Sequence, residues 1–376
     1  MPESKDPPVG VVLPVKALSA WTEALLQSVG TSPDVAADVA EVLVAADLRG
    51  IASHGTARLP NYLALVEAGV LDPAARPVKE RGKPALVRFD ANNGWGQHAG
   101  RVAMDDAIAR AAGLGAAISI VRNNNHYGIA GWYAMRAAEH GLIGVSLTNA
   151  GAMVAPTRAR APMLGTNPIA VAAPAGRFGM LVLDMATSTV PRGRIEVAAR
   201  RGESIPRGWA IGPDGLAATA PDDALRGALL PLGGEEATGG YKGYGLALVV
   251  EMLTGVLGGA TCGPHIMGLF STARNSDLGQ LFMAIDPTAI EEVGQFEARL
   301  EALLDDLTNA PRAANAPGPI LYPGQPEAER AAFQATDGVA LDQAVFESLA
   351  TLAARMGLPF PSTHMLPRTG TQGAEE

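Results

Sequence analysis

The chain has 376 residues, of which 48% are hydrophobic and 18% are charged, and this composition excludes a disordered protein. At roughly 100–200 residues per domain, the length predicts two or three folding units. The net charge of −9 argues against nucleic acid or an anionic membrane as a partner. The single cysteine, Cys262, excludes a disulfide within the chain and thiol-ligated metal sites, and it fits a reducing compartment. No apolar stretch resembles a secretory signal or reaches the about 18–20 residues of a membrane span, so we expect a cytoplasmic protein.

The N-terminal region predicts two helices. Ser32 and Pro33 form a favourable helix start, and apolar residues follow at helical spacing until Gly50, a favourable stop. A second helical pattern covers about 58–68. We expect residues 1–12, which are polar and rich in proline, to form a loose tail.

From about residue 85 the pattern changes to short apolar runs that are typical of buried strands. The predicted strands cover residues 116–121, 143–148, 169–174, 180–184 and 281–286. A helical pattern over 130–140 separates the first two strands, and this order indicates an α/β unit. A glycine-rich loop at 233–240 precedes a strong helix at 244–257. Further helices are predicted over residues 288–308, 326–335 and 341–356.

The common motifs for nucleotides and metals are absent from the sequence. Gly113 and Gly115 begin a G-x-G-x-x-G fingerprint, but Ile118 stands where its third glycine belongs. The chain also lacks a G-x-x-x-x-G-K-[ST] phosphate loop and an H-E-x-x-H motif. Its six histidines show no metal-ligand spacing, so we expect no metal site. Any dinucleotide site must therefore be built differently.

The segment 47–62 (DLRGIASHGTARLPNY) combines groups that suit acid–base chemistry. His54 lies in a short loop between two predicted helices, beside Ser53, which can fix the tautomer of its ring. An ordinary histidine pKa near 6.5 suits proton exchange with a substrate hydroxyl. Arg58, one helical turn further on, offers a planar guanidinium that can hold a carboxylate through two hydrogen bonds. The alternative is a surface histidine beside a helix-capping arginine.

The segment 122–133 (RNNNHYGIAGWY) lies where a predicted strand ends and a helix begins. Ligands of open α/β sheets bind at the carboxyl ends of strands, and a helix N-terminus favours a phosphate. His126, Tyr127 and Gly128 offer a hydrogen-bonding ring, a stacking ring and a close approach of the backbone. The alternative is an ordinary asparagine-rich turn.

Two further segments, 164–174 and 181–194, each couple an apolar strand to small hydroxyl residues at its end. Thr166, Thr187 and Ser188 could bind a cofactor or a carboxylate there. The alternative is ordinary turn chemistry at the end of a strand.

The segment 239–245 (GGYKGYG) is a glycine-rich helix start that carries Lys242. A lysine at a helix N-terminus is unfavourable for the helix dipole, so Lys242 is a candidate for holding an anionic ligand. The alternative is a flexible solvated loop.

Taken together, these segments resemble the malate/L-lactate dehydrogenase family, whose members lack a Rossmann fold. The family also includes ureidoglycolate, sulfolactate and 2,3-diketogulonate oxidoreductases and a piperideine-2-carboxylate reductase. The matching segments are D-L-R-G-I-A-S-H-G-T-A-R-L-P-N-Y (47–62), N-N-H-Y-G (124–128), L-G-T-N-P (164–168), D-M-A-T-S (184–188) and G-Y-K-G-Y-G-L-A-L (240–248). They occur in the order of the family, and the resemblance covers about residues 15–335. It implies an enzyme that uses NAD or NADP and transfers a hydride between nicotinamide and a small 2-hydroxy/2-oxo acid, of the malate/oxaloacetate or lactate/pyruvate type.

The resemblance also implies a role for each matching residue. His54 would donate and accept the proton at the substrate oxygen, supported by Ser53. Arg58 would bind the substrate carboxylate, with Thr166 nearby. The cofactor-binding residues would be His126, Tyr127 and Gly128 at the nicotinamide end, then Asp184, Met185 and Ala186, and finally Lys242 and Gly243, which would close the site.

The implied fold is of the α/β class, with a non-Rossmann NAD(P)-binding domain that contains a mixed sheet and a helical domain built from both chain ends. The expected regions are an N-terminal helical region on the substrate side at 13–84, the cofactor-binding domain at 85–286, a mostly helical region at 287–365 that packs back on the N-terminal region, and tails at 1–12 and 366–376. The implied assembly is a homodimer with sites near the interface.

One position bears on the substrate. Arg194 stands near the place where the imine-reductase branch of the family has an acidic residue that assists proton transfer. This favours the malate/lactate type, and the alternatives on the same scaffold are ureidoglycolate, sulfolactate, diketogulonate and cyclic-imine reductases. A catalytically idle ligand-binding protein is the alternative from another class, but His54 and the segment 124–128 are both intact. The sequence does not distinguish NAD from NADP.

Overall fold

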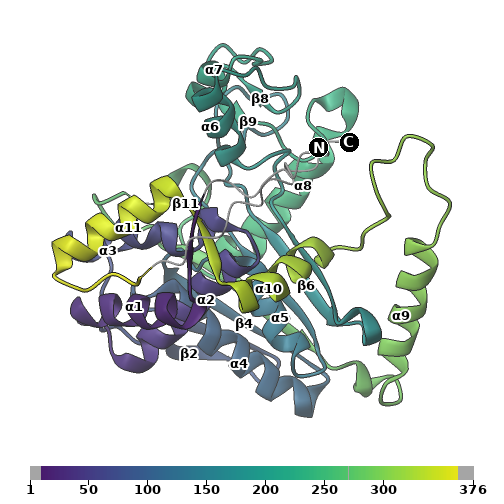
Figure 1. The fold of residues 1–376 in the computed structure, drawn as a ribbon. Coiled ribbons are helices and arrows are strands. Elements are labelled where there is room, and N and C mark those ends of the chain that lie inside the picture. Colours follow the sequence, from purple (N-terminus) through teal and green to yellow (C-terminus); the bar gives the residue numbers. More distant parts are fainter. Residues whose placement is uncertain (1–9, 270, 363–376) are drawn as a thin grey trace, which may run out of the picture. The chain divides into compact units, whose positions relative to one another are not determined.

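The computed structural model describes residues 10–269 and 271–362, and the tail expected at 366–376 lies outside them. The chain divides into two compact units, coloured along the sequence in Figure 1. Of the described residues, 10–60 and 327–362 belong to the first unit, so segments from both ends of the sequence contribute to it. Residues 61–326 form the second unit.

The first unit combines helices with one two-stranded sheet. Its elements are β1 (Gly10–Leu13), α1 (Val15–Ser28), α2 (Pro33–Leu48), most of α10 (Gln325–Asp337), β11 (Val339–Asp342) and α11 (Gln343–Met356). Helices α1 and α2 pack on each other, and both bury apolar residues at helical spacing, such as Leu18, Leu25, Val39 and Leu43.

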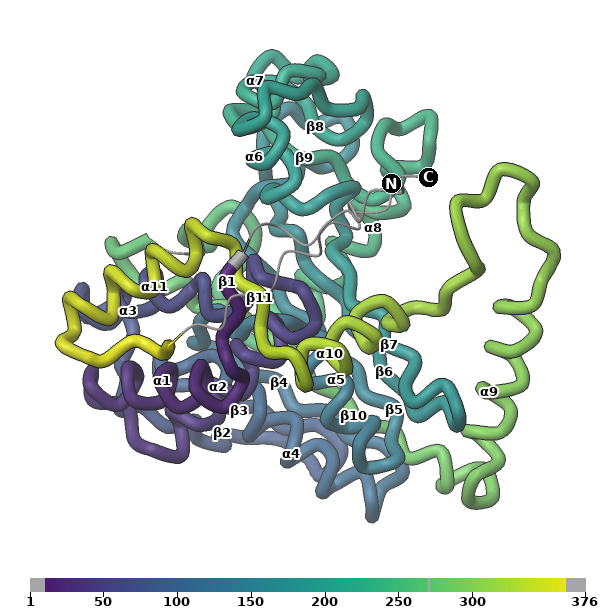
Figure 2. The backbone as a smooth tube through the Cα atoms, in the orientation of Figure 1, coloured from purple at the N-terminus to yellow at the C-terminus, as the bar shows by residue number. Residues whose placement is uncertain are grey.

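Strand β1 corrects the expected N-terminal tail, because residues 10–12 belong to this strand. It pairs antiparallel with β11, from Gly10 opposite Asp342 to Leu13 opposite Val339. Figure 2 shows the two strands side by side. A strand whose partner lies at the other end of the chain leaves no local periodic signal, which explains the error.

A seven-stranded mixed sheet organises the second unit. In spatial order its strands are β2 (Val78–Lys83), β3 (Leu86–Asp90), β4 (Ala116–Asn124), β10 (Leu278–Ile285), β5 (Ile143–Thr148), β6 (Ile169–Pro174) and β7 (Met180–Met185), an order that can be followed in Figure 2. Strands β3 and β4 are parallel, and the other neighbouring pairs are antiparallel. The expected α/β class and mixed sheet are therefore confirmed.

The predicted strands 143–148 and 169–174 have the bounds of β5 and β6, whereas β4 extends beyond its predicted end. Residues 122–124 thus belong to the strand, not to the polar turn that the sequence suggested. Strand β10 lies between β4 and β5 and runs antiparallel to both, so the two strands joined through the helix at 130–138 point in the same direction without being neighbours.

Helices cover both faces of this sheet. Helix α4 (Gly96–Leu114) packs on β4 and β10, and α5 (Ala130–Ala138) packs on β5, β6 and β7. Helix α8 (Gly240–Glu251) and the π-helical turn Met252–Val256 that continues it cover the other face. Side chains alternate along β10 accordingly: Phe282 meets Tyr133 of α5, while Leu281 belongs to a cluster with Val250 of α8. A sheet covered on both faces explains the unbroken apolar runs in the sequence.

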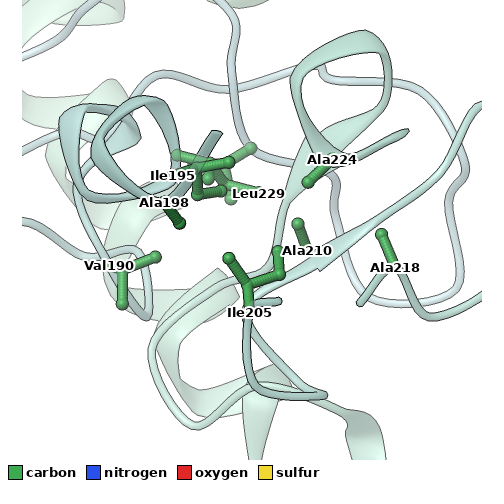
Figure 3. Close-up of a cluster of buried hydrophobic side chains, with 9 residues drawn as sticks. Val190, Ile195, Ala198, Ile205, Ala210, Ala218, Ala224 and Leu229 are labelled. Carbon is green, nitrogen blue, oxygen red and sulfur yellow. The ribbon is translucent and has the colours of Figure 1, made fainter. Parts of the chain in front are cut away.

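A small lobe, residues 186–232, follows β7. It contains α6 (Arg192–Arg201), β8 (Ala210–Ile211), α7 (Pro221–Arg226) and β9 (Ala228–Leu229). Figure 3 shows its core, in which Val190, Ile195, Ile205 and Leu229 cluster. Helices α3 (Leu59–Glu67) and α9 (Gln295–Thr308) complete the fold. Among the described residues, no helix is long and apolar enough to cross a membrane.

Candidate active site

The His54 loop, residues 49–58, follows helix α2. Gly50, with a φ of +75°, turns the chain after the helix. Two short 3₁₀ turns follow, Ala52–His54 and Thr56–Arg58, and α3 begins at Leu59. The sequence correctly predicts a short connection here, but Arg58 lies before α3 and not within its first turn.

The Nδ1 side of the His54 ring lies against Ser53. Ser53 Oγ lies 2.9 Å from His54 Nδ1, and Arg58 Nε donates to the carbonyl oxygen of Ser53 at 2.5 Å. Burial, and to a lesser extent the positive charge of Arg58, lower the pKa of His54 from 6.5 to about 4. A histidine on the open surface would keep an ordinary pKa, so these contacts disfavour that alternative. The ring is neutral at pH 7, as a base requires.

Asp47, in the last turn of α2 next to this loop, is a residue that the sequence reasoning missed. It is 4% exposed, and its Oδ2 accepts hydrogen bonds from the Thr56 amide at 2.9 Å and from Thr56 Oγ1 at 2.6 Å. Burial raises the pKa of Asp47 from 3.8 to about 7. The available signal was its spacing, since Asp47 follows Val39 and Leu43 on the buried stripe of α2.

In the second unit, the register of the sheet brings three motif segments to one edge. The register pairs Asn124 with Leu278, Thr148 with Gln280, and Ile169 with both Leu147 and Met185. The segments 124–128, 164–168 and 184–188 therefore begin or end at the same edge of the sheet. Sequence order alone could not show this, because the order of the strands depends on β10.

His126 is held through Tyr62, a contact that the sequence did not predict. The Tyr62 hydroxyl and His126 Nδ1 lie 2.6 Å apart, and Gln97 Nε2 donates to the Tyr62 oxygen at 3.0 Å. Gly96 packs so closely that an added Cβ would overlap the carbonyl oxygens of Asn125 and His126. The segment 124–128 is therefore held by specific side-chain and packing contacts, which disfavours the interpretation as an ordinary asparagine-rich turn.

Tyr127 corrects one expectation. Its ring is 1% exposed, stacks on Tyr133 at a centroid distance of 4.7 Å, and has its hydroxyl 3.1 Å from Ser146 Oγ. Burial raises the pKa of the Tyr127 hydroxyl well above its usual range. This ring belongs to the core and does not stack on a ligand. Gly128, with a φ of +83°, follows at the sheet edge.

The carboxylate of Asp184, a residue of strand β7, lies at the N-terminus of helix α5. Its Oδ2 accepts a hydrogen bond from the Gly131 amide at 2.7 Å, and a Cβ on Gly131 would lie 2.8 Å from that oxygen. The sequence suggested a phosphate at this N-terminus, but the carboxylate takes the position and would repel one. Met185 and Ala186 follow at the edge and are partly buried.

The hydroxyl residues near Asp184 have mainly structural partners. Thr187 Oγ1 donates to the carbonyl oxygens of Thr166 and Asn167 at 3.0 and 3.1 Å, and Ser188 Oγ donates to that of Val190 at 2.8 Å. Thr187 and Ser188 therefore conform to the alternative of turn chemistry. Thr166 remains partly exposed.

Helix α8 joins the same edge through backbone contacts. Asn167 Nδ2 donates to the Ala247 carbonyl oxygen at 3.0 Å. Gly243 is buried against Leu232, where a Cβ would overlap the backbone, so this glycine is required for close packing. Lys242 is exposed, with Nζ 5.9 Å from the Tyr241 ring centroid. The segments after 62 thus converge within the second unit.

A comparison with protein-family models decides the family. The model described as malate/L-lactate dehydrogenase matches residues 13–350. The chain belongs to this family. The resemblance that the five segments carry is therefore confirmed, and with it the expectation of a dehydrogenase.

Relatives in the malate/L-lactate dehydrogenase family cover most of the chain. A malate dehydrogenase of Pyrococcus abyssi is 42% identical over 304 residues, 80% of this chain and 83% of the relative. A Δ1-pyrroline-2-carboxylate/Δ1-piperideine-2-carboxylate reductase of Pseudomonas syringae is 36% identical over 86% of this chain and 91% of its own length. The solved sulfolactate dehydrogenase of Methanocaldococcus jannaschii matches with a TM-score of 0.86 and 34% identity, over 93% of this chain and 98% of that one.

The sheet edge fits the nicotinamide cofactor that the family implies. Its polar groups are the half-buried His126, the hydroxyl of Thr166, the carboxylate of Asp184 and backbone amides. Such groups suit a carboxamide and ribose hydroxyls. The cation Lys242, at the N-terminus of α8, suits a phosphate.

Proposed function

We propose that this protein is an NAD(P)-dependent oxidoreductase that transfers a hydride between nicotinamide and a small 2-hydroxy/2-oxo acid, of the malate/oxaloacetate or lactate/pyruvate type. The observation that carries the proposal is the His54 loop. It contains His54, whose lowered pKa keeps the ring neutral, and Arg58, which lies four residues later. Arg58 is hydrogen bonded to the carbonyl oxygen of Ser53, the residue before His54. A base beside a carboxylate-binding cation is what oxidation of a 2-hydroxy acid requires.

In this mechanism His54 exchanges the proton of the substrate hydroxyl. Ser53 Oγ engages Nδ1, and the proposal assigns the proton exchange to Nε2. In the oxidising direction Nδ1–H donates to Ser53 Oγ, and Nε2 takes the hydroxyl proton. In the reducing direction the protonated ring donates from Nε2 and stabilises the forming alkoxide.

Arg58 orients the acid in this proposal. Its Nε donates to the Ser53 carbonyl, which restricts the plane of the guanidinium, and a planar guanidinium suits a carboxylate in a forked geometry. The resemblance to the family also assigns Thr166 to the substrate. Arg58→Lys should therefore raise the KM for the acid with a smaller effect on kcat.

The cofactor would lie along the sheet edge of the second unit, and the substrate side would be supplied by the helical unit built from both chain ends. When bound, the nicotinamide accepts or supplies the hydride. The holding groups would be the His126 side chain, the Gly128 backbone, Asp184 with Met185 and Ala186, and Lys242 with Gly243. For Tyr127 the proposal keeps only a backbone role, because its ring is in the core. The domain is proposed to be non-Rossmann, since the sequence lacks the glycine fingerprint.

A histidine pair tests the assignment. His54→Ala should retain cofactor binding, measured by fluorescence titration with NADH and NADPH, and lose turnover by two orders of magnitude or more, about the usual contribution of general acid–base catalysis. The matched control is His140→Ala, because His140 is an exposed histidine whose Nδ1 bonds the Arg136 carbonyl oxygen at 2.8 Å. Equal turnover in both variants would remove His54 from the mechanism.

A spectrophotometric panel identifies the substrate and the cofactor. Oxidation of NADH and of NADPH would be followed with oxaloacetate, pyruvate, 2-oxoglutarate, sulfopyruvate, diketogulonate and piperideine-2-carboxylate. Turnover of one 2-oxo acid supports the proposed class. Turnover of the imine alone would overturn it in favour of the second candidate, a cyclic-imine reductase. Arg194 favours the acid, since its exposed guanidinium lies 6.0 Å from the Trp209 ring and supplies no carboxyl group.

A homodimer is also part of the proposal, as is a cytoplasmic location, which the single cysteine suits. Helix α8 supports the dimer, because Tyr241, Leu248, Met252 and Val256 are 48–66% exposed and lie on one side of the helix and its π-helical continuation. Leu248→Glu should lower the mass measured by light scattering to that of a monomer. The control Leu216→Glu changes a leucine of 69% exposure in the small lobe and should leave the mass unchanged.

A further inference from the structure

We propose that Asp47 and Thr56 form a clamp that positions His54, so that Asp47 and Thr56 are positioning residues for the reaction. The inference rests on the proposed role of His54. Its geometry lies entirely within the first unit.

The clamp closes the His54 loop at its base. Asp47 ends the buried stripe of α2, and its Oδ2 accepts two hydrogen bonds from one residue, from the Thr56 amide at 2.9 Å and from Thr56 Oγ1 at 2.6 Å. Thr56 is completely buried. The chain between Asp47 and Thr56 contains Ser53 and His54. If the hydrogen bonds of the clamp lengthened or broke, the imidazole of His54 would therefore move.

Gly55 allows the clamp to close. A Cβ at this position would overlap the Asp47 carboxylate, which therefore packs directly against the residue that follows His54. The φ of Gly55 is −90°, so the requirement for glycine is one of space and not of backbone conformation. A carboxylate this close to the loop backbone leaves the loop little room to move.

A second set of bonds fixes the helix end from which Asp47 acts. Gln334 of α10 donates from Nε2 to the carbonyl oxygens of Asp47 and Leu48 at 3.1 and 2.8 Å, and its Oε1 accepts from the Ala340 amide at 2.8 Å. The C-terminal part of the chain therefore anchors the clamp.

Asp47 is an unfavourable residue for stability alone. Its Oδ1 is buried without a hydrogen-bond partner, and burial raises the pKa of the carboxyl. A buried polar group that is only half satisfied persists where it sets a geometry that an apolar residue could not set. The geometry set here is that of the loop between Asp47 and Thr56.

The experiment compares threonine variants. Thr56→Val removes the hydroxyl bond and keeps the shape, and we expect kcat to fall by about ten-fold or more, since small displacements of a catalytic group have such effects. Cofactor affinity should not change. Thr56→Ser restores the hydroxyl and should recover most of the lost kcat. Thr22→Val is the control, because Thr22 is an equally buried threonine of the first unit whose Oγ1 donates to the Leu18 carbonyl at 2.8 Å. It should lower thermal stability without lowering kcat.

A spectroscopic measurement separates this inference from the proposed function. The imidazole of His54, assigned by its absence from the spectrum of His54→Ala, would be titrated by NMR in ring-labelled protein. In Thr56→Val its pKa should move from about 4 toward the ordinary 6.5 as the ring gains water. An unchanged titration together with unchanged kcat would overturn the clamp, even if His54→Ala is inactive. A moved titration would support the clamp even if His54→Ala stayed active and the proposed function failed.

Discussion

The pH dependence of hydroxy-acid oxidation provides a direct test of the site. His54 must be neutral to accept the hydroxyl proton, and its pKa is about 4 where an ordinary histidine has 6.5. At pH 5.5 a group with a pKa of 4 is still about 97% neutral, whereas an ordinary histidine is only about 10% neutral. We therefore expect kcat/KM to be nearly the same at pH 5.5 and pH 8. An unshifted histidine would instead produce a fall of about ten-fold.

The assay would measure initial rates of NAD(P) reduction at low concentrations of the hydroxy acid, from pH 5 to pH 8, with the cofactor saturating. Enzyme returned from pH 5 to pH 8 should regain its rate, which excludes denaturation. The His140→Ala variant should give the same curve as the unaltered protein. A ten-fold fall with a midpoint near 6.5 would refute the argument that burial and Arg58 hold His54 neutral.

Other predictions concern packing and linkage. Gly96→Ala should destabilise the protein by about 1–3 kcal/mol in urea unfolding, because its Cβ would overlap the carbonyl oxygens of Asn125 and His126. Gly113→Ala in the same helix meets nothing within 4 Å and should stabilise it by about 0.5–1 kcal/mol; a loss there equal to that of Gly96→Ala would contradict the packing argument. Between pH 3.8 and about 7 the folded Asp47 keeps a proton that the unfolded chain has lost, so its contribution to the free energy of unfolding falls as pH rises through this window. Asp47→Asn should remove this pH-dependent decline in the free energy of unfolding. If the variant and the unaltered protein differ in free energy of unfolding by the same amount at pH 5 and at pH 8, the raised pKa is contradicted.

Local signals predicted the central strands well because both faces of the sheet are covered. The runs 143–148 and 169–174 are mostly apolar and bounded by polar turns, so their limits could be predicted from the sequence. The order of the strands could not be predicted, because β10 lies between β4 and β5 in the sheet although it is more than 100 residues away in the sequence. Apart from Gln280, its own sequence is apolar and does not indicate which strand it pairs with.

In the candidate site, too, contacts between residues close in the sequence could be predicted, whereas contacts between distant residues could not. Ser53, His54 and Arg58 are close in the chain, so their spacing alone suggested a common role, and their contacts agree with it. The bond between Tyr62 and His126 joins residues 64 apart and had no local sign. In contrast, helical α1 (Val15–Ser28) was missed although Leu18, Trp21 and Leu25 carry the helical period.

The two causes of the lowered His54 pKa should respond differently to a bound acid. A carboxylate paired with Arg58 would cancel most of the charge that repels a proton from the imidazole. Burial, the larger cause, would remain or increase as the ligand excludes water. The bound state should therefore have a higher pKa than the free state but one still below 6.5. It follows that reduction of the 2-oxo acid, which needs a protonated His54, should gain rate as pH falls from 8 to 5.5, while kcat/KM of oxidation, which reports the free enzyme, stays level over the same range. The pH would thus affect the rates of the two directions differently through one side chain, while the net direction follows the proton that reduction consumes.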